Sequence, residues 1–441
     1  MTAGSHDLVI RGATLVTCDP EGTVLADAAV AIRGEKIDWI GPTALAPASA
    51  RRVIEARDRI LMPGLVNLHC HAADSLFRGL VEDLPLEPWL QTVWKAERAI
   101  LTEETCELGA RLGFAELLLS GVTTVMDMFW HPEATVRAAK ALGIRVATGG
   151  IFFDFPGMDG HGAERRRADA EAFAAAHAGD PTVFVGTLPH GTYTVGPAGL
   201  ADAFAVAEAA GGFFSTHAAE TRAEQDTVTG RYGRSVIRHL GALGLLSPRT
   251  VLAHCVHVDA EEIAAMAASG TTVAHNPLSN LKLASGFAPV PAMLEAGVNV
   301  ALGTDGAISG NDIDLWLAMR LAATLHKAVT GDATAVSPRQ ALAMATTAGA
   351  RALGASDRIG SIEVGKQADL VLVATDRVHA APLFDPVAHL VFAAGRADVT
   401  DVLVAGRPVV EAGRLLTADV PALLADVHAL KARTLASIGR T

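Results

Sequence analysis

Apolar and polar positions follow two patterns along the chain, and each pattern occupies its own region. Near the start, short β-branched runs alternate with glycine, aspartate and proline up to about residue 60, and similar runs return between residues 360 and 416. Such runs are typical of antiparallel strands and hairpins. Between the two regions, strand-like runs alternate with alanine-rich runs of helical spacing. That alternation predicts parallel strands joined by crossover helices.

The central region contains eight strand-like runs, which read LVNLHCH, VTTVMDM, IRVATGG, VFVGTLPH, FFSTHAAE, TVLAHCVH, TTVAHNP and VNVALGTDG. Eight parallel strands are the number that closes a barrel. We therefore predict an α/β fold in which a (β/α)8 TIM barrel spans residues 61–364. The strand-rich ends, residues 1–60 and 365–415, would together form one small β-sandwich, and residues 416–441 a C-terminal helix.

Composition and charge narrow the class of protein. Half of the 441 residues are apolar, which is enough for a large core and a smaller appendage. The net charge is −12 and no dense basic run is present, so nucleic acid is an unlikely partner and we expect a small-molecule substrate. The four cysteines form no C-x-x-C pair, as expected for reduced thiols. We find neither a signal-peptide pattern nor an apolar run of ~18 residues, so we expect a cytoplasmic protein without membrane contact. A homo-oligomer stays open.

Histidine and aspartate side chains stand at the ends of the predicted strands. The C-terminal strand ends of such a barrel form its active-site face, so these side chains should converge. Because strand side chains alternate between faces, His69 and His71 point the same way, into the barrel. Together with His217 and Asp305, they are expected to bind one divalent metal ion. Imidazole and carboxylate ligands suit Zn²⁺, and also Fe²⁺, Mn²⁺ or Ni²⁺.

Two other interpretations of these positions bear on the metal site. The side chains could instead be buried polar groups whose hydrogen bonds are satisfied within the protein. A second metal would need a bridging ligand, often a modified lysine near the end of the third or fourth strand. The runs IRVATGG and VFVGTLPH contain no lysine, which favours a single metal.

Hydrolysis at a metal also requires groups that move protons. Asp305 could act as the base that receives a water proton while it touches the metal. Glu220 follows His217 by three residues and could act as the proton shuttle. His254, at the end of the sixth run, could orient or polarise the attacking hydroxide. The alternatives are a solvated glutamate at a helix start and a buried histidine that bonds to the backbone.

Several long segments resemble one known family. They are PGLVNLHCHAADSLFRGLVEDLPLEPWL, HAAET, LAHCVHVD, AHNPLSNLKLASGFAPV and ALGTDGAISGNDIDLWLAMRLA. The sequence is similar to the amidohydrolase superfamily, in the branch of methylthioadenosine and S-adenosylhomocysteine deaminases and triazine chlorohydrolases. The resemblance implies that Glu97 holds the ribose hydroxyls of a nucleoside, that His190 contacts it, and that Trp94 belongs to the substrate site.

The chain departs from this family in three places. Lys95 follows Trp94 where proline is common, NPLSN replaces a more usual C-P-T-S-N, and the segment IFFDFPGMDGHG is unlike the family's loop. In the family, that loop contacts the far end of the substrate, where the 5′ substituent lies. The resemblance therefore does not assign the 5′ substituent.

The resemblance implies an aminohydrolase that acts on C–N bonds of cyclic amidines. We expect a metal-dependent hydrolytic deaminase of an adenine nucleoside of the methylthioadenosine, S-adenosylhomocysteine or adenosine type. Metal-held hydroxide would attack C6, Glu220 would protonate N1, and ammonia would leave. The alternative is an amino- or chlorohydrolase of another N-heteroaromatic ring, such as a triazine, pterin or guanine, for which a ribose-binding Glu97 has no purpose. A non-catalytic ligand-binding barrel is disfavoured because all metal and proton-transfer positions are filled.

Overall fold

The computed structural model describes residues 6–440, which divide into two compact units. The first unit contains residues 6–66, 117–124 and 314–417. The second unit contains residues 67–116, 125–313 and 418–440. The predicted domain boundaries at residues 60, 364 and 415 stay a prediction.

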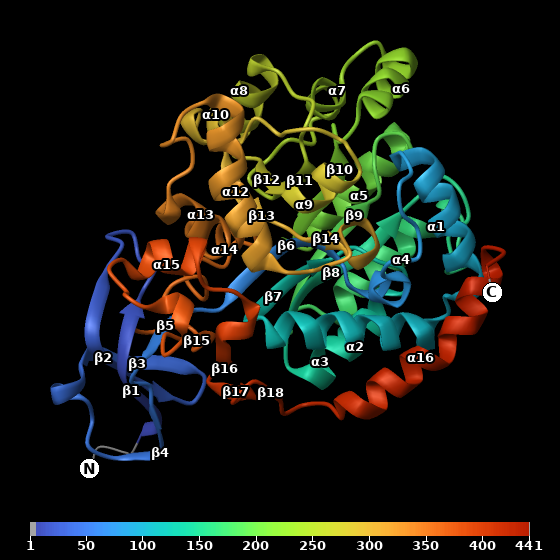
Figure 1. Cartoon of the computed structure of the whole chain (residues 1–441). Coiled ribbons are helices and arrows are strands. Elements are labelled where there is room, and N and C mark those ends of the chain that lie inside the picture. Colours follow the sequence, from blue (N-terminus) through green and yellow to red (C-terminus); the bar gives the residue numbers. More distant parts are fainter. Residues whose placement is uncertain (1–5, 441) are drawn as a thin grey trace. The chain divides into compact units, whose positions relative to one another are not determined.

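A nine-stranded sheet in the first unit joins strands from both ends of the chain (Figure 1). Its strands are β1 (His6–Val16), β2 (Val24–Arg33), β3 (Lys36–Pro42), β4 (Ala50–Glu55), β5 (Arg59–Pro63), β15 (Leu370–Ala374), β16 (Val399–Val404), β17 (Arg407–Glu411) and β18 (Arg414–Leu415). Strand β5 pairs antiparallel with β15 and thereby links the two ends. Buried side chains from both ends, such as Ile10, Leu61, Leu370 and Leu403, share one apolar cluster. The expected separate sheet of N- and C-terminal strands is confirmed.

Four α-helices and three short 3-10 helices are also part of this first unit. They are η1 (Thr43–Leu45), α12 (Leu315–Thr330), α13 (Pro338–Met344), α14 (Thr347–Ala352), η3 (Val378–Ala380), α15 (Pro386–Phe392) and η4 (Arg396–Asp398). Helix α12 packs against α13 and α15.

A second nine-stranded sheet forms the barrel. Its strands are β6 (Leu65–His71), β7 (Val122–Asp127), β8 (Arg145–Phe152), β9 (Val183–Pro189), β10 (Phe213–Ala218), β11 (Thr250–His254), β12 (Thr272–His275), β13 (Asn299–Leu302) and β14 (Asp305–Gly306). The pairs from β8 through β13, and β14 with β6, are parallel. All residues of β7 and β8 are buried, as expected for parallel strands that helices cover.

The eighth barrel strand is interrupted, and this interruption places Asp305. Strand β13 pairs with β12 and β14 pairs with β6, so the two pieces of one strand close the sheet. Between them, Gly303 N–H donates to the His275 carbonyl and Thr304 N–H donates to the His69 carbonyl. A Cβ on Gly303 would lie 2.2 Å from Asn276 Oδ1, so only glycine fits there. The chain therefore approaches β6 closely just before Asp305.

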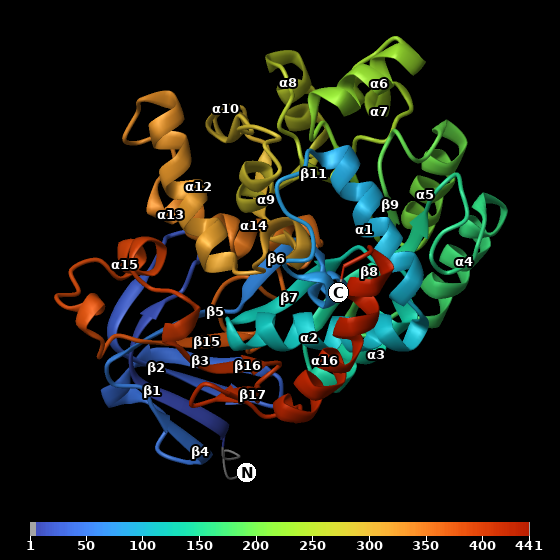
Figure 2. The same ribbon diagram turned by 45° about the vertical axis from the view of Figure 1, so that its right-hand side comes forward.

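Helices follow most barrel strands, as a (β/α)8 barrel requires. They are η2 (Ala72–Phe77), α1 (Leu86–Ile100), α2 (Glu103–Leu119), α3 (Pro132–Leu142), α4 (Ala163–Ala176), α5 (Pro197–Ala209), α6 (Arg222–Tyr232), α7 (Val236–Ala242), α8 (Ala260–Ser269), α9 (Pro277–Lys282), α10 (Val290–Glu295) and α11 (Ala307–Gly310). Helices α3 and α4 pack on β8, and α5 packs on β9. The last helix, α16 (Val420–Ser437), lies beside α1 (Figure 2). Among the described residues, no helix has the length and apolar character that crossing a membrane requires.

Candidate metal centre and active site

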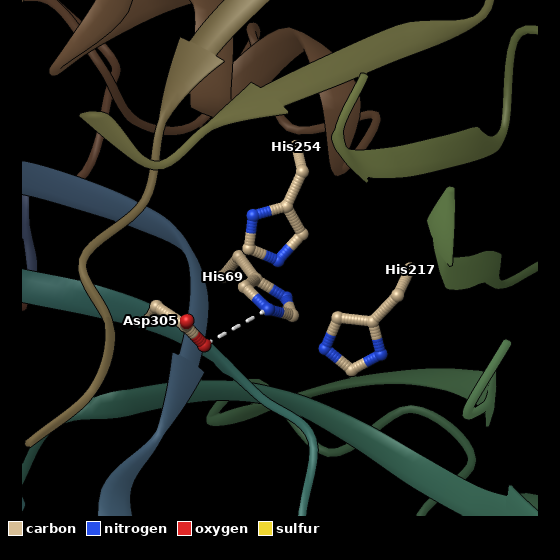
Figure 3. A group of neighbouring side chains, drawn as sticks. All are labelled: His69, His217, His254 and Asp305. Atoms are coloured by element: carbon tan, nitrogen blue, oxygen red, sulfur yellow. Dashed lines mark ion pairs between the residues drawn. The ribbon is translucent and has the colours of Figure 1, made fainter. Parts of the chain in front are cut away.

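Four buried side chains from four barrel strands meet at the C-terminal strand ends (Figure 3). His69 comes from β6, His217 from β10, His254 from β11 and Asp305 from β14. One ligand atom of each lies within 4.8 Å of the others, a spacing that allows all four to contact one metal ion. Three of these residues belong to the predicted ligand set, and His254 was predicted as a catalytic residue.

His71, the fourth predicted ligand, lies at the edge of this group. Its Nε2 is 3.1 Å from Asp305 Oδ1 and 3.3 Å from His217 Nε2. Five side chains therefore lie together at the mouth of the barrel. They are the four predicted ligands and His254.

Hydrogen bonds hold these side chains with one ligand atom facing the group. His71 Nδ1 lies 2.6 Å from the Met128 carbonyl, and His217 Nδ1 lies 2.6 Å from the His190 carbonyl. Because a carbonyl only accepts, each Nδ1 carries the proton that it donates, and Nε2 can keep its lone pair for a metal.

The Asp305 carboxylate is oriented in the same manner. The Ser279 and Ser309 hydroxyls donate to its Oδ2 at 2.7 and 2.8 Å. Its Oδ1 faces His69 and His71. Partners of this kind around a ligand fix its direction and support metal affinity.

The protonation states around His69 fit a divalent cation. His69 is fully buried and neither ring nitrogen has a hydrogen-bond partner among the described residues. Burial lowers the pKa of His69 to about 4, and burial with neighbouring histidines holds the pKa of His217 well below its usual range. Neutral imidazole is the form that binds metals.

His71 and Asp305 form an ion pair that a cation could replace. Against the effect of burial, the hydrogen bond and charge of Asp305 raise the pKa of His71 to about 10. Burial likewise opposes ionisation of Asp305, but His69 and His71 hold its pKa well below the usual range. A proton on His71 thus balances the carboxylate, and metal binding would release it.

Glu220 lies between β10 and α6, next to the histidines. Its backbone N–H donates to the Glu224 carboxylate at 2.7 Å, and Thr221 caps α6 directly after it. Its carboxyl accepts from the Ser285 hydroxyl at 3.4 Å and lies 3.8 Å from His254 Nε2. Burial raises the pKa of Glu220, so the carboxyl holds a proton more readily than in water.

The backbone is strained at the strand ends that carry the site. Ala219, His254 and Asp305 have φ values of 52°, 74° and 62°, a left-handed conformation that residues with a Cβ adopt rarely. Such strain gathers where a fold must aim side chains at one point.

A pocket opens above these residues and contains the three predicted substrate-binding positions, Glu97, His190 and Trp94. The His190 ring stacks on the Phe153 ring at a centroid distance of 4.8 Å. The centroid of the Trp94 ring lies 6.1 Å from that of His190. Burial lowers the pKa of His190 to about 3, so the ring is neutral. None of the described residues that line the pocket is lysine or arginine.

Two buried carboxyls line this pocket in addition to Glu220 and Asp305. Glu97 on α1 is 4% exposed and Asp74 on η2 is 6% exposed. Burial raises the pKa of Glu97 to about 7, and burial followed by the charge of Glu97 raises the pKa of Asp74.

Comparison with known proteins places this site in a family, because the model of the amidohydrolase family matches residues 60–409. The chain belongs to the amidohydrolase family. The predicted family resemblance is thereby confirmed, as is the barrel fold. An amidohydrolase relative in Syntrophobacter fumaroxidans, named 5-methylthioadenosine/S-adenosylhomocysteine deaminase, is 40% identical over 99% of this chain and 100% of its own length.

Two solved structures in this family share the fold over nearly the whole chain. An adenosine deaminase from Xanthomonas campestris with bound zinc has a TM-score of 0.95 and 38% identity, covering 97% of this chain and 98% of its own. A triazine hydrolase from Arthrobacter aurescens has a TM-score of 0.88 and 28% identity, and the match covers 96% of this chain and 99% of the hydrolase.

Sequence reasoning missed several polar groups of this amidohydrolase site. They are Asp74, Tyr193, Ser279, Ser285 and Ser309. Each lies on a turn, a short helix or a loop beyond a strand end, where strand alternation gives no direction. A short separation in sequence from a predicted ligand could have indicated two of them, since Asp74 follows His71 by three residues and Ser309 follows Asp305 by four.

Proposed function

We propose that the chain is a metal-dependent hydrolytic deaminase of an adenine nucleoside, of the methylthioadenosine, S-adenosylhomocysteine or adenosine type. The observation that carries the proposal is the convergence of His69, His217, His254 and Asp305 beside Glu220 in one pocket. The names of the 40% identical relative and of the zinc-containing deaminase structure support it. Water replaces the amino group at C6, and ammonia is released.

One divalent metal ion, Zn²⁺ above Fe²⁺, Mn²⁺ or Ni²⁺, is proposed as the cofactor. His69, His71, His217 and Asp305 would hold it, with His254 close enough to be a further ligand. A bound cation would supply Lewis acidity, which makes water a nucleophile near neutral pH. The His69 nitrogens, which have no hydrogen-bond partner among the described residues, and the zinc in the related structure support this assignment.

Three residues of the chain move or direct protons in the proposed reaction. Asp305 Oδ1 receives the proton of the attacking water, since Oδ2 is occupied by two serine hydroxyls. Glu220 delivers a proton to ring atom N1, a task that its burial-raised pKa favours. His254 orients the attacking group, because its Nδ1 lies 2.8 Å from Asn280 Oδ1 and this contact fixes the ring.

Glu97, His190 and Trp94 are proposed to bind the nucleoside. Glu97 would accept hydrogen bonds from ribose hydroxyls, and the neutral His190 ring beside Trp94 would contact the sugar or base. The described lining residues include no lysine or arginine, so a 5′ substituent without negative charge is favoured. Methylthioadenosine and adenosine have uncharged 5′ groups and meet this requirement, whereas S-adenosylhomocysteine carries a carboxylate together with an ammonium group.

Hydrolysis of another aminated or chlorinated N-heteroaromatic ring, such as a triazine, pterin or guanine, is the second candidate. The likeness to the triazine hydrolase favours it. A buried ribose acceptor such as Glu97 speaks against a bare ring. The cytoplasmic location and a homo-oligomeric state stay predictions from the sequence.

Ammonia release from a panel of substrates tests the proposal. The zinc-loaded protein would be given methylthioadenosine, adenosine, S-adenosylhomocysteine, guanine, a pterin and an aminotriazine. We expect the highest kcat/KM with methylthioadenosine or adenosine. Release from guanine, the pterin or the triazine alone would replace the nucleoside proposal by the second candidate.

A further inference from the structure

Asp74 is a buried carboxyl in the pocket that none of the proposed steps uses. It lies on η2, three residues after His71, and its side chain lines the pocket. It is 6% exposed, and its Oδ1 has no hydrogen-bond partner among the described residues. An acceptor that is buried without a donor costs stability, so its retention calls for a ligand that supplies the donor.

Glu97 forms a pair with Asp74 across two different elements. The two carboxyls lie close enough for each to shift the pKa of the other, and burial is the main cause that raises both pKa values. Glu97 is 4% exposed, and its Oε2 also lacks a partner among the described residues. The carboxyl pair, Asp74 and Glu97, therefore presents one unpartnered oxygen from η2 and one from α1 to the same pocket.

The surroundings of the carboxyl pair require donors from outside the protein. No lysine or arginine is found among the described lining residues, and a protonated His71, which also lines the pocket, is paired with Asp305. A phosphate or a carboxylate would be repelled there. Hydroxyl groups donate to both oxygens without adding charge to the pocket.

We propose that Asp74 binds the substrate together with Glu97, and that each member of the carboxyl pair accepts one hydroxyl of the ribose 2′,3′-diol. This inference rests on the proposed nucleoside deamination and names Asp74 as a specificity residue of that site. If Glu97 accepted both hydroxyls alone, the Asp74 oxygen would stay buried and unpaired in the complex. If each residue accepts one hydroxyl, both carboxyl oxygens gain a hydrogen-bond donor.

Deoxynucleosides and single variants test this division. The kcat/KM of the wild type, Asp74→Ala and Glu97→Ala would be measured with adenosine, 2′-deoxyadenosine and 3′-deoxyadenosine. The wild type should discriminate against both deoxy substrates. Asp74→Ala should lose roughly tenfold or more of the discrimination at one hydroxyl and keep it at the other, because only that hydroxyl has lost its acceptor. Glu97→Ala should show the opposite selectivity.

Ser75→Ala is the matched control. Ser75 is the next residue of η2, is buried, and its hydroxyl also lacks a partner among the described residues, but it does not line the pocket. Both discrimination ratios should stay at the wild-type level in this variant. If Asp74→Ala does not fold, Asp74→Ser is judged by the same criterion, since its shorter hydroxyl cannot replace the carboxyl.

The outcomes separate this inference from the proposed function. Wild-type ratios in Asp74→Ala would overturn the inference while the deaminase proposal stands, and so would a loss at the same hydroxyl in both variants. A wild type that releases no ammonia from any adenine nucleoside would instead overturn the proposed function.

Discussion

At the scale of single residues, burial sets the proton affinities that the chemistry needs. His69 and His190 are kept neutral because an imidazolium is poorly solvated there, while the Glu220 carboxyl holds its proton more readily than in water. The same burial therefore prepares a candidate metal ligand, an imidazole of the substrate pocket and a proton donor.

Replacement of Glu220 tests the proposed proton transfer. Glu220→Gln keeps the size and polarity of the side chain but removes the transferable proton, so kcat should fall on the order of 10²-fold or more. Zinc content, measured by elemental analysis, should not change. The exposed Glu208 on α5 provides a control, and Glu208→Gln should retain wild-type turnover. Turnover near the wild-type level in Glu220→Gln would show that another group donates the proton.

Glu97 should make the stability of the protein depend on pH. Its pKa is about 7 in the folded chain and its ordinary value is 4.5, so the folded state binds more protons than the unfolded state between these values. The free energy of unfolding should therefore fall as pH rises from 4.5 to 7, by about 1–3 kcal/mol. Glu97→Gln should remove this part of the pH dependence.

Denaturant unfolding of the metal-free protein across this pH range measures the effect. Glu87→Gln, on the exposed face of the same helix, is the control and should keep the wild-type slope. Parallel pH profiles for the wild type and Glu97→Gln would contradict the prediction.

The sequence predicted site residues well where strand geometry decides their direction. His69 and His71 share a face because strand side chains alternate, and both lie at the barrel mouth. Asp74 and Ser309 could not be placed, because they lie on η2 and α11 beyond the strand ends. The roles of the placed residues stay predictions.

At the scale of elements, the barrel strands and α1 contribute different groups to the site. The strands carry the candidate metal ligands, whereas α1 carries Trp94 and Glu97 and borders the pocket. Helix α16 packs beside α1, and the Arg433 guanidinium donates to the carbonyls of Ala99 and Ile100 at 3.2 and 3.1 Å. The far end of the chain thus holds the C-terminal end of α1.

Loss of this contact should weaken substrate binding more than chemistry. Arg433→Ala leaves the last carbonyls of α1 to water and loosens the helix, so KM should rise several-fold while kcat and zinc content change little. The free energy of unfolding should fall by about 1 kcal/mol. Lys431→Ala changes an exposed cation of the same helix and is the control. A fall in kcat with unchanged KM would contradict a role of α16 in supporting α1.

The eight barrel strands could be predicted because each is an apolar run of suitable length between helical segments. All eight are present, and only the eighth is divided, into β13 and β14. The division at Gly303 was not predicted, because it depends on the close approach of the chain to β6. The packing of α16 on α1 was not predicted either, since the sequence pattern predicts a helix but not the element against which it packs.

At the scale of the whole molecule, charge should select the substrate. The chain carries a net charge of −12, and the described lining of the pocket contains acidic groups and imidazoles but no lysine or arginine. Adenosine monophosphate should therefore have a kcat/KM about a hundredfold or more below that of adenosine. Higher salt should reduce the difference, because it screens the repulsion. Equal turnover of both compounds would show that the pocket binds a phosphate after all.

Titration of the chelated protein with zinc tests metal-dependent nucleoside deamination most directly. Methylthioadenosine would be present throughout, and ammonia release would be recorded against the zinc added per chain. We predict no activity without metal, and then a linear rise that ends at one zinc per chain, because His69, His217, His254 and Asp305 surround a single position. Full activity in the chelated protein, or no ammonia at any zinc content, would contradict the account.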